Sequence, residues 1–190
     1  MAEPTDPLRA PDPAPRKPRA DSSPRADAAL SMAPICGEIP IRIARDGTWF
    51  YHGSPIGRKA LVRLFASVLR RADDGAYHLV TPVERGAIEV EDAPFVAVLC
   101  DSSGEGRAQR LAFTTNLDEI VAAGPAHPIR AGGTQDAPAP YLLVRPGLEA
   151  RIARAVYYQL VELGREEVVD GRLAFGVWSD GAFFPLAPAG

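Results

Sequence analysis

The chain has 190 residues, 46% of them hydrophobic and 24% charged, and its formal net charge at pH 7 is −3. The acidic balance argues against a binder of duplex nucleic acid, no apolar run approaches the roughly 18 residues of a membrane span, and two cysteines, Cys36 and Cys100, are too few for a disulfide framework. We therefore expect a cytoplasmic protein of one large or two small domains, with reduced cysteines and without a membrane span, a metal or another cofactor.

Residues 1–32 are rich in Pro, Ala, Arg and Asp, and Leu8 and Leu30 are almost their only large apolar side chains. Such a segment cannot bury enough apolar surface to offset the entropy that ordering would cost. We expect a disordered, solvated tail, although its mixed charges leave contact with a partner open.

The next segment predicts a β-hairpin followed by a helix. Ile41 and Ile43 alternate with other residues, and the pair at 46–47, Asp-Gly, supplies a turn before the aromatic residues at 49–51. Ser-Pro at 54–55 then predicts a helix over about 56–71. Its apolar stripe is expected to contain Leu61, Leu64, Phe65, Val68 and Leu69. On the opposite side, Lys59, Arg63 and Arg70 are expected to form a solvated face with too few charges to hold a nucleic-acid backbone.

Further along the chain, short strands alternate with turns. The nearly continuous apolar run at 95–100 predicts a central strand covered on both faces, paired antiparallel with 109–115. Asn116 is expected to cap a short helix that ends near residue 124. The other expected elements are strands at 77–80, 87–90 and 141–144, a surface loop at 131–140, a helix over 148–163 that ends at Gly164, and a closing hairpin at 171–184.

The order of these elements predicts a two-part α+β fold. A strand, a helix, an Asp-Gly turn and a strand follow one another around 49–80 and again around 141–178, and Trp49 and Trp178 each lie beside an Asp-Gly turn, which suggests a duplicated motif. The breaks after residue 80 place the parts at 33–83 and 84–190. Because the connection between them is short, we expect the two parts to pack as one rigid unit.

Several collinear segments resemble the bacterial family catalogued as domain of unknown function 1285. They lie at 46–56, 61–65, 79–84, 90–95, 113–116, 127–130 and 144–149, and the resemblance extends over about residues 36–186. It implies a two-part α+β fold with a duplicated motif and a C-terminal part that is superficially similar to a pleckstrin-homology-like barrel. It also implies a ligand site between the parts, a nucleotide-like ligand and a role in signal transduction, and it brings no enzymatic activity.

The aromatic strand end supplies the first candidate site residues. Trp49, Tyr51 and His52 could form a stacking platform for a base, although burial in the core is the favoured interpretation for Trp49. His52 directly precedes the Gly-Ser-Pro helix start, where free backbone N–H groups could hold an anion.

Charged residues supply the other candidates. Arg58 lies in the first turn of the predicted helix, where the helix dipole disfavours a cation, so we expect it near a phosphate or near Glu84 across the joint between the parts. Glu149 falls in the buried arc of the second predicted helix and needs a cation, for which Arg130 and Arg145 are the candidates.

These residues favour a non-enzymatic ligand-binding or signal-transduction module that holds an anionic, nucleotide-like molecule between its parts. The alternative is a protein-interaction module that uses the barrel-like C-terminal part. A hydrolase with His52 as base and Glu84 as its orienting partner ranks third, and we assign no catalytic residue. The three histidines, His52, His78 and His127, are too dispersed for the sequence to predict a metal site.

Overall fold

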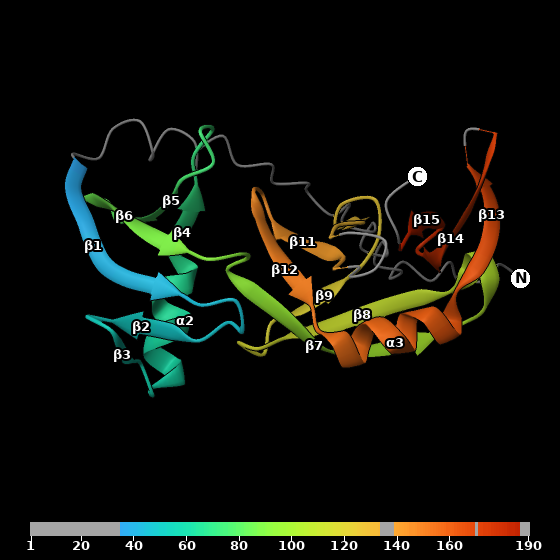
Figure 1. Ribbon diagram of the computed structural model, residues 1–190, viewed down its shortest axis with the longest axis horizontal. Helices are drawn as coiled ribbons and strands as arrows, with labels where there is room; N and C mark the ends of the chain where they lie inside the picture. Colours follow the sequence, from blue (N-terminus) through green and yellow to red (C-terminus); the bar gives the residue numbers. More distant parts are fainter. Residues whose placement is uncertain (1–34, 134–138, 170, 187–190) are drawn as a thin grey trace, which may run out of the picture.

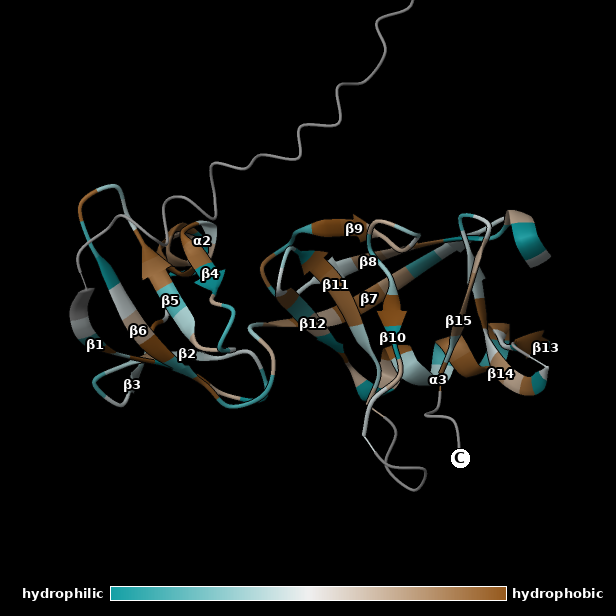
Figure 2. Cartoon of the chain, turned by 90° about the horizontal axis from the view of Figure 1, so that it is seen from above, coloured by the Kyte–Doolittle hydropathy of each residue, from teal (hydrophilic) through white to brown (hydrophobic). Residues whose placement is uncertain are grey.

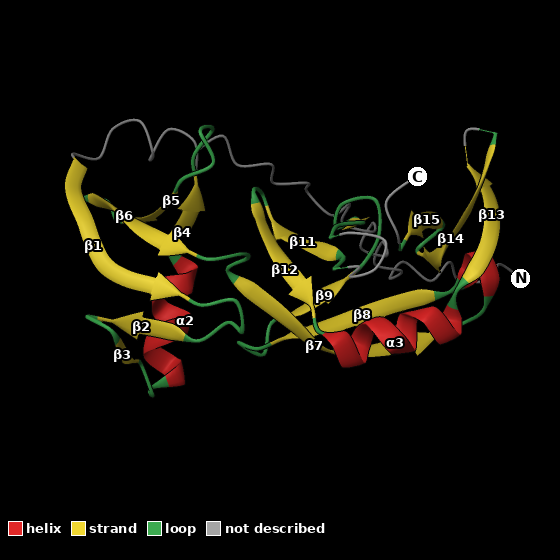
Figure 3. Ribbon diagram, in the orientation of Figure 1, coloured by secondary structure: helices red, strands yellow, loops and turns green. Residues whose placement is uncertain are grey.

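The computed structural model describes residues 35–133, 139–169 and 171–186, so the predicted disordered tail lies outside the described residues. Within them the chain is mostly β-strand, with two six-stranded sheets, one three-stranded sheet and two α-helices (Figures 1 and 3). Neither of these helices has the length and apolar character needed to cross a bilayer.

The first sheet has the strand order β3-β2-β1-β6-β5-β4. Its strands are β1 (Ile35–Ile43), β2 (Trp49–Tyr51), β3 (Ser54–Pro55), β4 (Leu69–Arg71), β5 (Tyr77–Val80) and β6 (Arg85–Val90). The hairpin predicted around residues 46–47 is confirmed, because β1 and β2 pair antiparallel with Ile43 opposite Trp49. At the centre of the sheet, β1 and β6 run parallel.

The second sheet has the strand order β10-β11-β12-β7-β8-β9. Its strands are β7 (Phe95–Ser103), β8 (Arg110–Thr115), β9 (Ile120–Ala122), β10 (Ile129–Arg130), β11 (Tyr141–Arg145) and β12 (Leu148–Ile152), and the short 3-10 helix η1 (Gly106–Ala108) precedes β8. The predicted central position of β7 and its antiparallel pairing with β8 are confirmed. Coverage of both faces extends only over residues 95–97, because Val98 and Leu99 are exposed.

The two six-stranded sheets share one topology. In each sheet an antiparallel meander of three strands lies beside a second such meander, and the first and sixth strands run parallel at the centre. The helices break the likeness, since α2 (Lys59–Ser67) follows the third strand of its sheet whereas α3 (Arg154–Leu163) follows the sixth. The duplicated motif predicted from residues 49–80 and 141–178 therefore pairs elements that occupy different positions in the two sheets.

A small third sheet completes the second part. Strands β13 (Arg165–Val169), β14 (Arg172–Ser179) and β15 (Ala182–Pro185) pair antiparallel in that order. The predicted closing hairpin is confirmed as β14 and β15, while β13 was not predicted. In Figure 1 the hairpin of β13 and β14 extends beyond the end of α3.

Both predicted helices are shorter than expected. Helix α2 ends at Ser67, and residues 69–71 form a strand that pairs with β5. The predicted apolar stripe is also wrong in part, because Val62 and Ala66 are the buried residues of α2 and Leu64 is 61% exposed. A continuous cluster of buried apolar side chains includes residues from both sheets, which Figure 2 shows as brown segments within each part.

The second helix and the helix predicted after Asn116 also required correction. Residues 148–152 form β12, in which Leu148, Ala150 and Ile152 point into the core with the period of two of a strand. Residues 116–124 contain a turn and β9 instead of a helix, and the Asn116 side chain bridges the parts, as described below.

The change from the first sheet to the second takes place at residues 91–94. Strand β6 pairs with both β1 and β5, so the expected division between residues 83 and 84 falls inside the first sheet. Below, the first part denotes residues 35–93 and the second part residues 94–186.

Candidate functional site

Polar contacts between the two parts begin at helix α2. Lys59 Nζ lies 2.6 Å from Asp118 Oδ1, Arg63 also forms an ion pair with Asp118, and Arg63 Nε donates a 2.8 Å hydrogen bond to the carbonyl of Leu117. The solvated face predicted for Lys59 and Arg63 is therefore corrected, since both cations bind the second part. The hydrogen bond from Lys59 holds the pKa of Asp118 below its usual value.

Arg145 and Asn116 extend this interface. Arg145 Nη2 binds Glu119 at 2.8 Å within its own part, while Nη1 donates to the carbonyl of Ala66 in α2 at 3.2 Å. The amide nitrogen of Asn116 donates to the carbonyl of Gly47 at 3.1 Å. The candidate residue Arg145 therefore joins the two parts.

A polar cleft of about 470 Å³ is lined by residues of both parts. The first part and the connection contribute Arg71, Tyr77 and Asp92, and the second part contributes Arg130, Gly133, Tyr141 and Glu149. Every side chain in this lining can form a hydrogen bond. Two residues of the sequence-predicted set, Arg130 and Glu149, are therefore brought together at a boundary between the parts.

Arg130 and Glu149 form the predicted ion pair. Arg130 Nε donates to Oε1 at 2.9 Å and Nη2 donates to Oε2 at 2.8 Å, and this hydrogen bonding raises the pKa of Arg130. The Arg130 guanidinium also lies 4.5 Å from the ring centre of Tyr141, its partner across strands β10 and β11. The bidentate geometry occupies much of the donor capacity of Arg130.

Asp92 organises the same wall of the cleft. The Tyr141 hydroxyl donates to Asp92 Oδ1 at 2.7 Å, and Oδ2 lies 3.5 Å from Arg151 Nε and 3.6 Å from Arg45 Nε. Burial, followed by the hydrogen bond to Asp92, raises the pKa of Tyr141, so the phenol stays protonated and donates at neutral pH. These bonds leave Asp92 with little capacity for another partner.

Arg71 and Tyr77 are the groups of the cleft with spare hydrogen-bonding capacity. Arg71 Nε donates one long hydrogen bond of 3.3 Å to the Gly75 carbonyl, and the guanidinium lies 5.4 Å from the Tyr77 ring centre. Within the described residues, no carboxylate forms an ion pair with Arg71. Burial raises the pKa of Tyr77, so its hydroxyl is a neutral donor. The cleft can therefore offer an incoming anion a cation that no carboxylate neutralises.

Arg58 and Glu84 do not support the expected contact across the joint. Arg58 is the exposed N-cap residue of α2, and in the part of the chain that the structure describes it forms no ion pair with Glu84. Glu84 is exposed, and its backbone N–H donates a 3.1 Å hydrogen bond to the hydroxyl oxygen of Thr81. The expected pairing is wrong because Glu84 lies in the turn that joins β5 to β6 within the first sheet.

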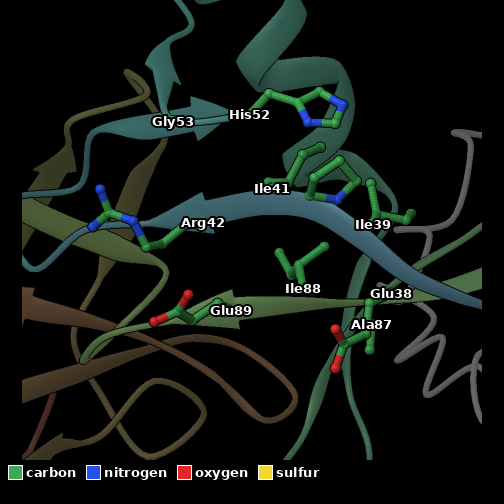
Figure 4. Close-up of a pocket in the computed structure, with 10 residues that line it drawn as sticks. Glu38, Ile39, Ile41, Arg42, His52, Gly53, Ala87, Ile88 and Glu89 are labelled. Atoms are coloured by element: carbon green, nitrogen blue, oxygen red, sulfur yellow. The ribbon is translucent and has the colours of Figure 1, made fainter.

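Trp49 and His52 have different surroundings. Trp49 is 2% exposed and stacks on Phe65 with ring centres 6.4 Å apart, so it serves the core, as favoured from the sequence. His52 is exposed and lines a larger cavity in the first part, shown in Figure 4. The predicted residues therefore do not form one site, since the interdomain cleft contains neither of these two side chains.

Sequence reasoning missed Arg71, Tyr77, Asp92 and Tyr141. The sequence predicts Arg71 in the last turn of a helix, and from that position its place in the cleft could not be inferred. In the structure it lies on strand β4 and lines the cleft. The alignment of Tyr141 with Arg130 comes from the antiparallel pairing of β10 and β11, which the sequence does not show. Among the described residues, no group of three potential metal ligands comes together.

Two family models match the sequence. The N-terminal domain of DUF1285, a domain of unknown function, matches residues 32–93, and the C-terminal domain of DUF1285, a protein of unknown function, matches residues 94–186. Their meeting point coincides with the passage from β6 to β7.

Two solved structures are similar to this chain. The crystal structure of a DUF1285 family protein from Silicibacter pomeroyi DSS-3 is 52% identical, with a TM-score of 0.75 over 82% of this chain and 83% of that chain. The crystal structure of a DUF1285 family protein from Shewanella baltica OS155 is 30% identical, with a TM-score of 0.50 over 63% of this chain and 88% of that chain. No curated protein matches the chain.

Proposed function

The chain belongs to the DUF1285 family, whose function is unknown, and we propose that it is a ligand-binding module that holds an anionic, nucleotide-like small molecule in the interdomain cleft. The observation that carries the proposal is the position of Arg71 in a polar cleft of about 470 Å³ to which both parts contribute. This volume lies within the range of small-molecule sites.

Charge supports an anionic ligand. Glu149 neutralises Arg130, and Asp92 is shared among Tyr141, Arg45 and Arg151, whereas Arg71 has no ion-pair partner among the described residues. A phosphate beside Arg71 would gain charge-assisted hydrogen bonds from the guanidinium and a further bond from the Tyr77 hydroxyl.

The flat groups of the cleft support a base or another planar ring. Arg71 stacks on Tyr77 and Arg130 stacks on Tyr141, so each part presents one layered pair of planar groups. Guanidinium and aromatic planes are the surfaces on which bases stack in proteins without sequence-specific contacts. Together with the anion site, they favour a nucleotide over phosphate alone.

Isothermal titration of the full chain with AMP, adenosine and inorganic phosphate tests the proposal. We expect AMP to bind more tightly than adenosine or phosphate, and Arg71→Ala to weaken AMP binding about tenfold through loss of a charge-assisted bond. Arg70→Ala is the matched control, because Arg70 is the neighbouring residue and bonds instead to the carbonyls of Ser67 and Leu69. Absence of binding by AMP, or equal losses in the two variants, would reject the proposal.

A signalling role follows from the position of the cleft. A ligand that contacts both Arg71 and Tyr141 would stabilise one relative packing of the two parts. A partner molecule that binds this packing would then respond to the ligand. The proposal places this role in the cytoplasm, where the two cysteines would remain reduced.

We also propose that the two parts arose by duplication and that the second part is similar to pleckstrin-homology-like barrels. The shared strand order of the two sheets supports an origin by duplication. A curved six-stranded sheet followed by the single helix α3 supports a likeness of the second part to pleckstrin-homology-like barrels (Figure 1).

A second candidate function is protein interaction through the second part. Val168 and Leu173 are a directly opposed pair on β13 and β14, and they are 70% and 67% exposed. Strand β13 is also an edge strand of its sheet, so one side is open to addition of a partner's strand. A Leu173→Ser variant that keeps AMP binding but loses capture of a purified partner would favour this function.

A further inference from the structure

An apolar cavity of about 490 Å³ lies in the first part, between the first sheet and helix α2. Its floor consists of Ile39 and Ile41 on β1 and Leu79 on β5. Ile39 and Ile41 are two residues apart on one strand, so their side chains lie on one face of the sheet (Figure 4). Phe65 of α2 also lines the cavity, so this is the face that the helix covers.

Two walls enclose the space above this floor. The hairpin of β2 and β3 contributes Tyr51 and Ser54 to one wall, and α2 contributes Leu61 and Phe65 to the other. The floor is buried, whereas Tyr51 and Leu61 are 50% and 37% exposed. The cavity therefore extends from the core to a mouth at the surface.

The walls are separate because the chain does not form a helix directly after β2. His52 and Gly53 both have a positive φ, of 47° and 76°, and form a two-residue turn that pairs β3 (Ser54–Pro55) with β2. Helix α2 therefore begins only at Lys59. The Ser-Pro pair that predicted a helix start instead forms the edge of a hairpin that faces the helix across the cavity.

The lining selects an apolar group. No charged side chain is among the described residues that line the cavity, and Tyr51 and Ser54 supply its hydroxyl groups. A charged group that entered would lose its hydration without gaining a partner of opposite charge. The volume lies within the range of small-molecule sites, which are lined mainly by apolar side chains. The part of a ligand that enters this cavity must therefore be apolar.

Arg58 supplies a cation beside the mouth. It lies two residues after Ile56 and three before Leu61, both of which line the cavity. Of the carboxylates that the structure describes, none forms an ion pair with Arg58, whereas its neighbour Lys59 binds Asp118. The first turn of α2 contains no acidic residue, and the positive end of the helix dipole favours an anion there. The charge at this side of the mouth therefore complements an anionic head group.

We infer that this cavity binds a fatty acid of medium chain length, with the chain against Ile39, Ile41 and Leu79 and the carboxylate at Arg58. The cavity determines that the ligand has an apolar chain, and Arg58 determines which end of it faces solvent. The inference is independent of the proposed nucleotide site, because the two cavities share no residue.

Chain length tests the apolar part of the site. The full chain is titrated by calorimetry with butanoate, hexanoate and octanoate at neutral pH. We expect octanoate to bind about tenfold more tightly than hexanoate, because each buried methylene group increases affinity up to about fourfold. Equal affinities along the series, or no binding by octanoate, would overturn the inference.

The head group tests the role of Arg58. We expect octanoate to bind up to about fivefold more tightly than 1-octanol, the range of an exposed ion pair, and octylamine to bind most weakly. Arg58→Gln should remove the difference between octanoate and 1-octanol and leave 1-octanol binding unchanged. Octylamine that bound as tightly as octanoate would reject a carboxylate as the ligand.

Variants of two leucines locate the site. Leu61→Gln should weaken octanoate binding about tenfold, because it replaces apolar surface of the cavity with an amide. Leu64→Gln is the matched control, since Leu64 is an exposed leucine of the same helix outside the cavity, and it should change binding less than twofold. Equal losses in these two variants would show binding without a defined site and reject the inference.

Arg71→Ala separates this site from the nucleotide site. Arg71 lines the interdomain cleft and not the apolar cavity, so its loss should leave octanoate binding unchanged. Octanoate binding that fell with Arg71→Ala as much as with Leu61→Gln would place the fatty acid in the cleft and overturn the inference.

Discussion

The carboxylate of Glu149 holds the guanidinium of Arg130 by two parallel hydrogen bonds, of 2.9 Å from Nε and 2.8 Å from Nη2, at one wall of the cleft between the two sheets. The Arg130 side chain is 54% exposed, so solvent screening limits the contribution of the pair to stability to less than about 1 kcal/mol. Its main effect is on the charge of the cleft, where it neutralises the second guanidinium and leaves Arg71 as the available one.

Glu149→Gln is therefore expected to strengthen AMP binding several-fold while lowering the free energy of unfolding by less than about 1 kcal/mol. The amide can no longer neutralise Arg130, so two guanidinium groups face the ligand. Calorimetric titration and urea unfolding measure the two effects. Glu162→Gln, an exposed change on α3, is the control, and unchanged or weaker AMP binding by Glu149→Gln would contradict the expectation.

Asp118→Asn should lower stability in a pH-dependent way. The Lys59 hydrogen bond lowers the pKa of Asp118 in the folded protein, so its stabilisation is present above the unfolded pKa near 4 and is lost as the pH falls through the folded pKa. We expect the variant to melt a few degrees below wild type at pH 7 in low salt, and the difference to disappear in strong acid. Asn tolerates the left-handed φ of 61° at this position, so the backbone should be kept.

Thermal unfolding of wild type and Asp118→Asn between pH 2 and 8 measures this difference. Asp73→Asn, in an exposed turn of the first part, serves as the control for loss of one negative charge. A difference that stayed constant down to the lowest pH would show that the Asp118 charge does not join the two parts.

Gly47→Ala should destabilise the joint between the parts by about 1–3 kcal/mol. Gly47 has a φ of 83°, and an added Cβ would lie 2.5 Å from the amide nitrogen of Asn116, which bonds to the Gly47 carbonyl. Urea unfolding gives the change in the free energy of unfolding. Gly57→Ala is the control, because its Cβ would meet open space, and a similar loss in both variants would argue against the contact.

Cys100 should react slowly with thiol reagents. Burial raises its pKa to about 12, so at pH 8 only about 1 in 10,000 molecules would carry the thiolate, which is the reactive form. In a Cys36→Ser variant, we expect iodoacetamide to label the native protein far more slowly than the protein unfolded in urea. Similar rates in the two states would show that the thiol is not protected.

The sequence predicted features that depend on neighbouring residues or on a single obligatory partner. The Asp-Gly turn before Trp49 specified the first hairpin, because the turn and the alternation of Ile41 and Ile43 agree. The need of Glu149 for a cation identified Arg130, although the carboxylate was placed on a helix and lies on a strand.

Features that depend on distant pairing were harder to predict. The apolar positions Leu148 and Ile152 are four residues apart, a spacing that fits one face of a helix as well as one face of a strand, and pairing with β7 decides for the strand. Arg71 follows the same rule, since its strand forms only because residues 77–79 lie beside it. The position of Arg71 in the cleft therefore depends on the pairing of β4 with β5, which the sequence alone does not specify.

The parallel pairing of the first and sixth strands also orders events during synthesis. Strand β1 can take its central position only after β6 has been made, so the first sheet can close once residue 90 has left the ribosome, before the second part exists. The second sheet must wait in the same way for β12 to reach β7, and α3 is made only afterwards. Each part therefore closes a loop of about fifty residues in a single late step, with the high contact order of a slowly folding β protein.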